Sequence, residues 1–209
     1  ASASHGMPAG SATVQWSDRD GRLAYALAGT LSHTGRQALL DEWNRAVDAG
    51  GRPTLLRHAP LTERVTSDGI ELAPRLQWAL EGEGSLAWQS LLSVRRLASR
   101  RHALETAYLG GTTAYPDNQA NFDQDSGTVR SGLHWLRKLA QGASLDVKLG
   151  ASVNHRDNDY LFLGRGAAPG QGSTRQVDSG VDEVGVQASG TYRRALGQHH
   201  TLAAGWDAG

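Results

Sequence analysis

The 209-residue sequence contains no cysteine, which excludes disulfide bonds and thiol chemistry. Its 21 basic and 21 acidic side chains balance, so it lacks the excess positive charge that nucleic-acid binding requires. No stretch approaches the roughly 18 consecutive apolar residues of a membrane-spanning helix. The chain does contain 26 glycines and six tryptophans, and this composition favours strands and turns over packed helices.

The segment 145–154 has the clearest periodicity. It reads LDVKLGASVN, so that Leu145, Val147 and Leu149 alternate with polar or small residues. Successive side chains of a strand point to opposite faces, whereas a helix would scatter these residues around its circumference. The alternation therefore predicts a strand with one apolar and one polar face.

The same alternation recurs in segments near 12–16, 23–32, 70–81, 183–192 and 202–206, and more weakly in 86–94 and 129–136. Several of these segments reach the roughly 9–11 residues that a tilted strand needs to cross a bilayer. Six aromatic residues share the apolar phase near strand ends, as membrane-interface aromatics do: Trp16, Trp78, Trp88, Trp135, Tyr192 and Trp206. The strand pattern alone fits a soluble β-sandwich equally well.

Connector length distinguishes the two folds. Short connectors fall at 18–21, 82–84, 139–142 and 194–199, and longer polar stretches fall near 34–68, 96–126 and 156–179. Tight turns on one side and long loops on the other are typical of a transmembrane β-barrel wall. We therefore predict an all-β, antiparallel, up-and-down barrel wall of about eight strands. Within the loops we expect a short helix at 36–47 and a hairpin-like excursion at 102–110, and Pro74 should mark a bulge or an edge.

Four phrases of the sequence are informative beyond their periodicity. The segment from Thr128, TVRSGLHWLRKLAQGASLDVKLG, places Trp-x-Arg-Lys-Leu before a tight glycine turn. It is flanked by YPDNQANFDQDSG and NHRDNDYLFLG, and the chain ends in HHTLAAGWDAG. The first phrase resembles the barrel of TonB-dependent outer-membrane receptors, the two flanking stretches are similar to extracellular-loop borders of that family, and the last is similar to a further barrel strand. The resemblance covers most of residues 11–209.

The resemblance implies a bacterial outer-membrane receptor for energy-coupled uptake of a nutrient of the siderophore, cobalamin or glycan class. Such receptors have a barrel of roughly 22 strands filled by a plug domain, and TonB acts on a segment near the N-terminus. The implied partners are outer-membrane lipid, the protein's own plug domain, TonB and a small nutrient ligand. We expect residues 11–209 to be an internal part of the larger barrel, and residues 1–10 to be disordered or a scar of cloning.

Two sets of candidate contact residues follow from this interpretation. The polar phase of the strands is expected to face the lumen or the plug, where charge is tolerated: Gln15, Arg75, Gln77, Asp146, Lys148, Glu183 and Gln187. Aromatic residues of the long loops are expected to contact the ligand: Trp43, Tyr108, Tyr115, Phe122, Tyr160 and Phe162.

Catalytic and metal chemistry have little support in the sequence. No Gly-x-Ser-x-Gly elbow occurs, and the glycine-rich stretch 164–172 lacks the Lys-Ser/Thr ending of a phosphate loop. His199 and His200 would face opposite ways in a strand, and Asp157 and Asp159 do not form a complete cation loop. We therefore expect no enzyme activity, no metal and no cofactor.

Two other folds and one enzyme class remain open. A complete eight-stranded barrel with an adhesin or structural role requires segment 12–17 to pair with segment 200–208. A soluble β-sandwich binding module requires the apolar face to pack on a second sheet. A hydrolase on a β scaffold requires Ser, His and Asp side chains within hydrogen-bond reach of one another.

Overall fold

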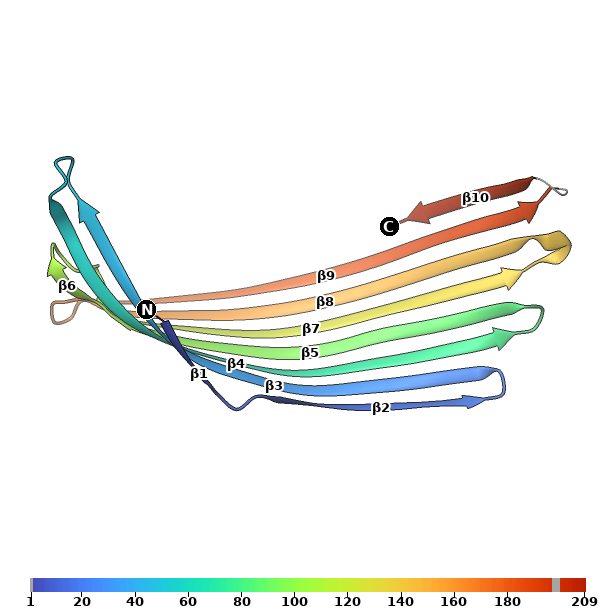
Figure 1. The fold of residues 1–209 in the computed structure, drawn as a ribbon, viewed down its shortest axis with the longest axis horizontal. Helices are drawn as coiled ribbons and strands as arrows, with labels where there is room; N and C mark the ends of the chain where they lie inside the picture. The colour runs from blue at the N-terminus through green and yellow to red at the C-terminus, as the bar shows by residue number, and fades with distance from the viewer. Residues whose placement is uncertain (1, 197–199) are drawn as a thin grey trace.

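A computed structural model describes residues 2–196 and 200–209. These residues form one antiparallel sheet of ten strands, which confirms the predicted all-β, up-and-down architecture (Figure 1). The strands are β1 (Ser2–Gly6), β2 (Gly10–Asp20), β3 (Leu23–Val47), β4 (Pro53–Leu80), β5 (Gly84–Leu104), β6 (Thr106–Leu109), β7 (Asp117–Lys138), β8 (Ser144–Arg165), β9 (Gly172–Ala195) and β10 (Thr201–Ala208). A 3₁₀ turn, η1 (Ala140–Gly142), joins β7 to β8.

Eight of the strands, β2 to β5 and β7 to β10, lie side by side in chain order. Their tight connectors are at the right of Figure 1, and three of these contain residues with positive φ: Gly21 at 54°, Gly82 at 75° and Gly142 at 72°. Only glycine adopts this conformation without a steric penalty. The predicted turns at 82–84 and 139–142 are confirmed. At 18–21 the turn is limited to Gly21 and Arg22, because residues 18–20 belong to β2 and pair with β3. Of the fourth connector, residues 197–199 lie outside the described part.

The far ends of the strands differ from the prediction. The stretches 34–68, 96–126 and 156–179 are not long loops, because most of their residues extend β3, β4, β5, β7, β8 and β9 in paired register, with one shift between Ala46 and Val47. The predicted helix at 36–47 is wrong for the same reason: Arg36 to Ala46 pair with β4. Both faces of these extensions carry polar residues. The sequence there therefore lacks the alternation of apolar and polar residues that identifies a strand.

Two smaller expectations change as well. The stretch 102–110 continues β5 to Leu104 and then forms β6, which pairs with β4 between Leu56 and His58. Of the two alternatives for residues 1–10, disorder is wrong for the paired residues, because β1 pairs with β3 and β2 begins at Gly10. A scar of cloning stays a prediction. Pro74 marks neither the expected bulge nor an edge, because β4 is an inner strand and keeps its register; the β4–β5 ladder only lacks pairs at residues 73 and 74.

The sheet is open and consists of one layer. Within the described residues β2 pairs only with β3, and β10 pairs only with β9, so the closure of a complete eight-stranded barrel is not formed. Only Ala38, Leu61 and Ala143 are buried hydrophobic residues in this part of the chain. No helix in the described ranges is long and apolar enough to span a membrane. The tight-turn halves form a broad curved sheet, and the far β3–β4 hairpin bends away from it (Figure 1).

Candidate functional site

The cross-strand register divides the side chains between two faces. We call the face of Leu149 the outer face and the face of Lys148 the inner face. On the outer face, the tight-turn halves of the strands form an apolar band. It consists of alternate residues in 12–16 of β2, 23–31 of β3, 70–80 of β4, 86–94 of β5, 129–135 of β7, 145–153 of β8, 184–192 of β9 and 202–208 of β10. None of these outer-face positions holds Asp, Glu, Lys, Arg or His.

The apolar band is open to its surroundings. Val184 is 77% exposed, Val14 is 74% exposed and Trp206 is 50% exposed. The second sheet that a sandwich requires is absent from the described part of the chain, which has all its strands in one sheet. An exposed apolar surface of this extent needs a nonaqueous neighbour.

The serines of the band satisfy their own hydroxyl groups. Ser90 on β5 donates to Ser131 on β7 at 2.9 Å, and the indole N–H of Trp88 donates to Ser131 Oγ at 2.8 Å. A hydroxyl that is withdrawn from water is costly unless it is hydrogen-bonded. This cluster therefore allows two polar residues to lie in an otherwise apolar band.

The predicted interface aromatics all lie on the outer face, within the band. Trp78, Trp135 and Trp206 fall in one row of cross-strand partners. Trp16 packs on Tyr25 with ring centroids 5.0 Å apart. Gly190 on β9 lies under the ring of Trp206, where a Cβ atom would collide with the indole. All six predicted aromatics thus share one face, as the alternation of the sequence predicts, and their place at a membrane interface stays a prediction.

The tight-turn edge of the band is slanted relative to the strands. Asp18 on β2 is in the same cross-strand row as Leu133 on β7 and Ala188 on β9. Toward the tight turns, the first charged residue on the outer face of β7 is Arg137, four residues past Leu133. On β9 it is Arg194, six residues past Ala188. Relative to Asp18 on β2, the edge is displaced by four residues on β7, which is four strands away, and by six residues on β9, which is six strands away. The edge therefore moves by one residue per strand. With about 3.3 Å per residue and about 4.8 Å between strands, the slant is about 35°, within the tilt range of membrane-barrel strands.

Charged side chains begin at the other edge of the band. His33 pairs with Asp68 at 2.6 Å, and Arg96 lies 3.8 Å from Asp125. Further along, His155 bonds Asp182 at 2.6 Å and Asp157 at 2.9 Å. The hydrogen bond with Asp182, and then that with Asp157, raises the pKa of His155 above its ordinary value. The apolar band is therefore bordered by a row of exposed ion pairs.

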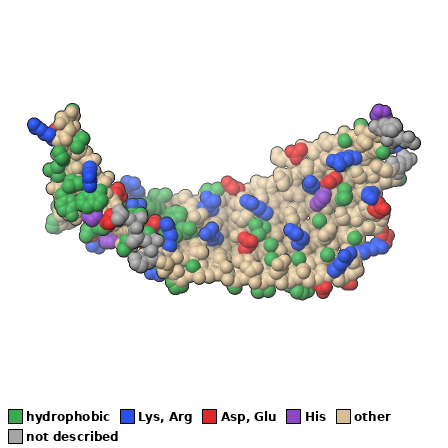
Figure 2. Space-filling model, in the orientation of Figure 1, with side chains coloured by type: hydrophobic (Ala, Val, Ile, Leu, Met, Phe, Trp, Pro, Cys, Tyr) green, Lys and Arg blue, Asp and Glu red, His purple; other side chains and the backbone are tan. Residues whose placement is uncertain are grey.

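The seven predicted lumen-facing residues share the inner face. Arg75, Gln89, Gly132, Gly150 and Gln187 form one cross-strand row, and the other predicted residues lie in parallel rows of the same phase. A shallow trough of about 800 Å³ lies over this row. Figure 2 shows the sheet from one side: over its tight-turn half, hydrophobic side chains are sparse and Lys and Arg side chains are scattered among polar and backbone atoms.

The six predicted ligand-contact aromatics separate into two clusters on opposite faces. On the outer face of the far β3–β4 hairpin, Trp43 stacks on His58 at 4.3 Å and lies near Tyr108 at 5.9 Å. On the inner face, Tyr115 meets Phe162 edge-to-face at 6.1 Å, and Phe122 is the cross-strand partner of Tyr160. These four inner-face residues come from β7, β8 and the connector before β7.

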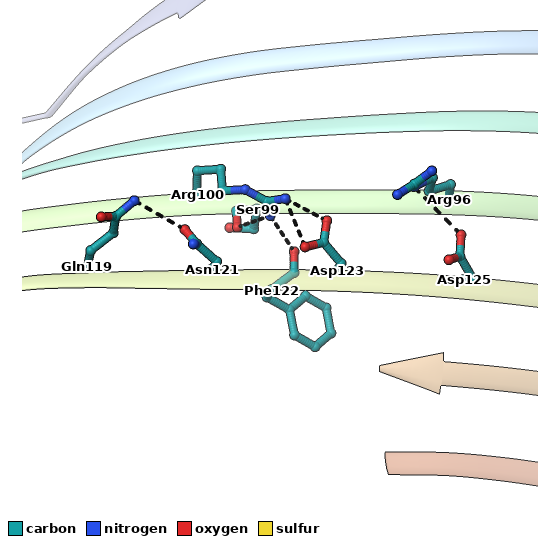
Figure 3. Close-up of polar contacts among 8 residues, drawn as sticks. All are labelled: Arg96, Ser99, Arg100, Gln119, Asn121, Phe122, Asp123 and Asp125. Carbon is teal, nitrogen blue, oxygen red and sulfur yellow. Dashed lines mark hydrogen bonds and ion pairs between the residues drawn. The ribbon is translucent and has the colours of Figure 1, made fainter. Parts of the chain in front are cut away.

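The structure adds charged neighbours that the sequence reading missed. Arg101 on β5 and Arg175 on β9 lie in the same inner-face row as Phe162. On the opposite face, Arg100 donates twice to the carboxylate of Asp123 at 2.8 Å, and also donates to the Phe122 carbonyl at 3.2 Å. Figure 3 shows the Arg100 guanidinium directed at both groups, with the Phe122 ring directed away. The faces of these residues could have been predicted from the sequence by continuing the strand alternation through 96–104 and 156–164.

No described group of three or more His, Asp or Glu side chains is arranged to hold a metal ion. Four histidines instead form single cross-strand pairs with aspartates, as His134 does with Asp146 at 2.8 Å, and His155 bonds both Asp157 and Asp182. Serine hydroxyls do not join these pairs in the described part of the chain, so the convergence that a hydrolase needs is not formed there. His199 lies outside the described residues.

The chain matches no protein-family model, and no curated protein is significantly similar to it.

Proposed function

We propose that the chain forms part of the barrel wall of an outer-membrane receptor for energy-coupled nutrient uptake. The observation that carries the proposal is the charge-free apolar band on one face only, opposite a polar inner face. In a barrel, lipid meets the apolar side while the interior stays wet or is filled by a plug. A role in transport, not in catalysis, fits a sheet whose polar side chains line its inner face.

The height and slant of the band support a membrane location. On β3, β5, β8 and β9 the band covers nine residues, and on β4 eleven, as in 145–153 and 70–80. Tilted strands need about 9–11 residues to cross the hydrocarbon layer. The open edges of β2 and β10 would then pair with further strands, because an exposed edge invites pairing.

Gene deletion in the source bacterium tests the proposed function. Cells should lose growth on one limiting nutrient that is scarce in the medium, whether an iron chelate, cobalamin or a glycan. Uptake of that nutrient in intact cells should also stop when the proton gradient is collapsed by an uncoupler. Unchanged uptake of all three nutrient classes in the deletion strain would contradict the proposal.

A further inference from the structure

We call the strand halves farther from the tight turns the distal halves. On the inner face of the distal halves of β5, β7, β8 and β9, charge is distributed unevenly, which the net charge of the chain conceals. Between 95 and 103 on β5, 118 and 126 on β7, 156 and 164 on β8, and 173 and 181 on β9, the inner-face residues include four arginines: Arg95, Arg101, Arg156 and Arg175. None of these positions holds Asp or Glu. On the outer face the same strands carry seven aspartates: Asp117, Asp123, Asp125, Asp157, Asp159, Asp178 and Asp182.

Aromatic side chains lie between two of these arginines. Arg101, Ala120, Phe162 and Arg175 are successive cross-strand partners in one inner-face row. Phe162 thus has Arg175 directly beside it, and the small Ala120 separates it from Arg101. Phe122 and Tyr160 lie in the parallel row two residues closer to the apolar band. The side chains of Phe122, Tyr160 and Phe162 are only half-buried, so the aromatic surface is accessible.

A glycine holds the fourth ring against this surface. The connector residue Tyr115 packs over Gly164 of β8, where a Cβ atom would lie 2.6 Å from the tyrosine Cγ. Tyr115 then meets Phe162 edge-to-face. Asn118 donates to the Tyr115 carbonyl at 3.1 Å and fixes the connector. The aromatic group is therefore assembled from separate segments.

Both arginines of this row are exposed, and their guanidinium groups are available to a ligand. Among the described residues, Arg101 and Arg175 have no hydrogen bond or ion pair, whereas Arg100 on the other face is bound to Asp123. The nearest inner-face acid is Glu63, the cross-strand partner of Arg101, and it is bound to Arg36 at 3.0 Å. Guanidinium groups pair strongly with carboxylate, sulfonate or phosphate oxygens, and aromatic rings favour flat unsaturated groups.

We propose that the inner-face cluster of Arg101, Arg175, Phe122, Tyr160, Phe162 and Tyr115 binds an anionic compound that carries a flat aromatic group. The proposal rests on the proposed function in taking this inner face as open to an incoming solute. It names the chemistry of that solute: one or two negative charges at the arginines and a planar group over Phe162 and Ala120.

Calorimetric titration of the full chain, refolded in detergent micelles, tests the proposal with three probes. Naphthalenesulfonate carries both features, naphthylmethylammonium keeps the ring and reverses the charge, and methanesulfonate keeps the charge without the ring. Naphthalenesulfonate should bind about tenfold or more tightly than either of the other two, because each loses one class of contact. Equal affinity for the anionic and cationic naphthalenes would overturn the proposal.

Variants locate the binding. The double variant R101Q/R175Q should weaken naphthalenesulfonate binding about tenfold to a hundredfold, because two charge-assisted contacts are lost. Gly164→Ala should weaken it less, by displacing Tyr115. Arg64→Gln, an exposed arginine of the outer face, is the matched control and should leave binding unchanged. An unchanged affinity in R101Q/R175Q overturns the proposal, and the retained naphthalenesulfonate affinity of Arg64→Gln shows that the loss of an arginine does not by itself prevent folding.

The outcomes separate this inference from the proposed function. If the deletion strain loses energised uptake but the purified chain does not prefer naphthalenesulfonate, the binding site is refuted and the receptor function stands. If the chain binds the probe through Arg101 and Arg175 but deletion leaves uptake unchanged, the receptor function is refuted and the binding site stands.

Discussion

The tight-turn halves and the distal halves of the same strands differ in what their outer face can contact. Both halves share one hydrogen-bonded ladder, as on β8, where pairing with β9 runs without interruption from Ser144 to Arg165. The outer face of β8 is apolar from Leu145 to Val153 and then carries His155, Asp157 and Asp159. Backbone pairing therefore builds the sheet, and side-chain chemistry alone divides it into a part suited to lipid and a part suited to water.

The largest expected effect comes from placing a charge on each part of one strand. Leu149→Arg lies at the middle of the apolar band, and Leu161→Arg lies on the same face of the distal part of β8. In lipid vesicles Leu149→Arg should lower the free energy of unfolding by about 2–4 kcal/mol, since a guanidinium at the bilayer midplane is costly. Leu161→Arg should be close to neutral. Urea unfolding measured by tryptophan fluorescence provides the comparison, and equal losses in the two variants would remove the distinction between the halves.

Turn glycines should not distinguish the two halves. Gly142 in a tight turn has φ 72°, and Gly170 in a distal connector has φ 80°; no atom lies within 4 Å of an added Cβ at either position. Alanine should cost about 1 kcal/mol at each site, because only the left-handed conformation is penalised.

The control for the turn glycines is Gly127→Ala. Its backbone has ordinary φ and open space around the new methyl group, so its stability should be unchanged or slightly raised. Unfolding of the three variants in micelles, each compared with the unchanged protein, measures the change in the free energy of unfolding. A cost at Gly127 equal to that at Gly142 would show that the loss does not arise from φ.

The cross-strand ion pairs of the distal part should be weaker still. Arg100 binds both oxygens of Asp123 at 2.8 Å, whereas Arg96 lies 3.8 Å from Asp125 on the same two strands. Double-mutant cycles with glutamine and asparagine should give a coupling of about 0.5–1 kcal/mol for the bidentate pair and a value close to zero for the other. A larger coupling for Arg96 and Asp125 would contradict the geometry (Figure 3).

The smallest effect concerns pH at the border between the two halves. Because Asp182 and Asp157 raise the pKa of His155, the stabilisation of its charged form is complete below the ordinary value of 6.5. That stabilisation is lost as the pH rises through the elevated pKa. Asp182→Asn should lower the pKa of His155, as followed by NMR of the imidazole protons, while Asp68→Asn should leave it unchanged. A pKa of His155 that is unaffected by Asp182→Asn would exclude this pairing.

The tight-turn halves could be predicted from the sequence because an apolar outer face opposite a polar inner face imposes a period of two. Leu145, Val147 and Leu149 alternate with Asp146 and Lys148, and no other regular structure separates these residues into two faces. The distal halves could not be predicted in this way, since both of their faces meet water and carry polar residues. In 36–47, the spacing of Leu39, Leu40, Trp43 and Val47 imitated a helix, and pairing with β4 overrode it.

The candidate sites follow the same division. The predicted lumen-facing residues and interface aromatics could be assigned to the inner and outer face, respectively, because alternation fixes the face of each strand residue. The inner-face aromatic cluster could not, because it depends on register across β5, β7, β8 and β9 and on a connector ring over Gly164. A one-residue error in register would move Arg101 and Arg175 to the other face.

The most direct test of the two-faced sheet uses the absence of cysteine, which leaves every introduced thiol as the only one. Leu149→Cys and Lys148→Cys are carried separately in the full chain, labelled with a nitroxide and reconstituted in lipid vesicles. Electron paramagnetic resonance should show the label at 149 relaxed by oxygen, which concentrates in hydrocarbon, and the label at 148 relaxed by a water-soluble nickel chelate. Preferential relaxation of both labels by the nickel chelate would contradict the account.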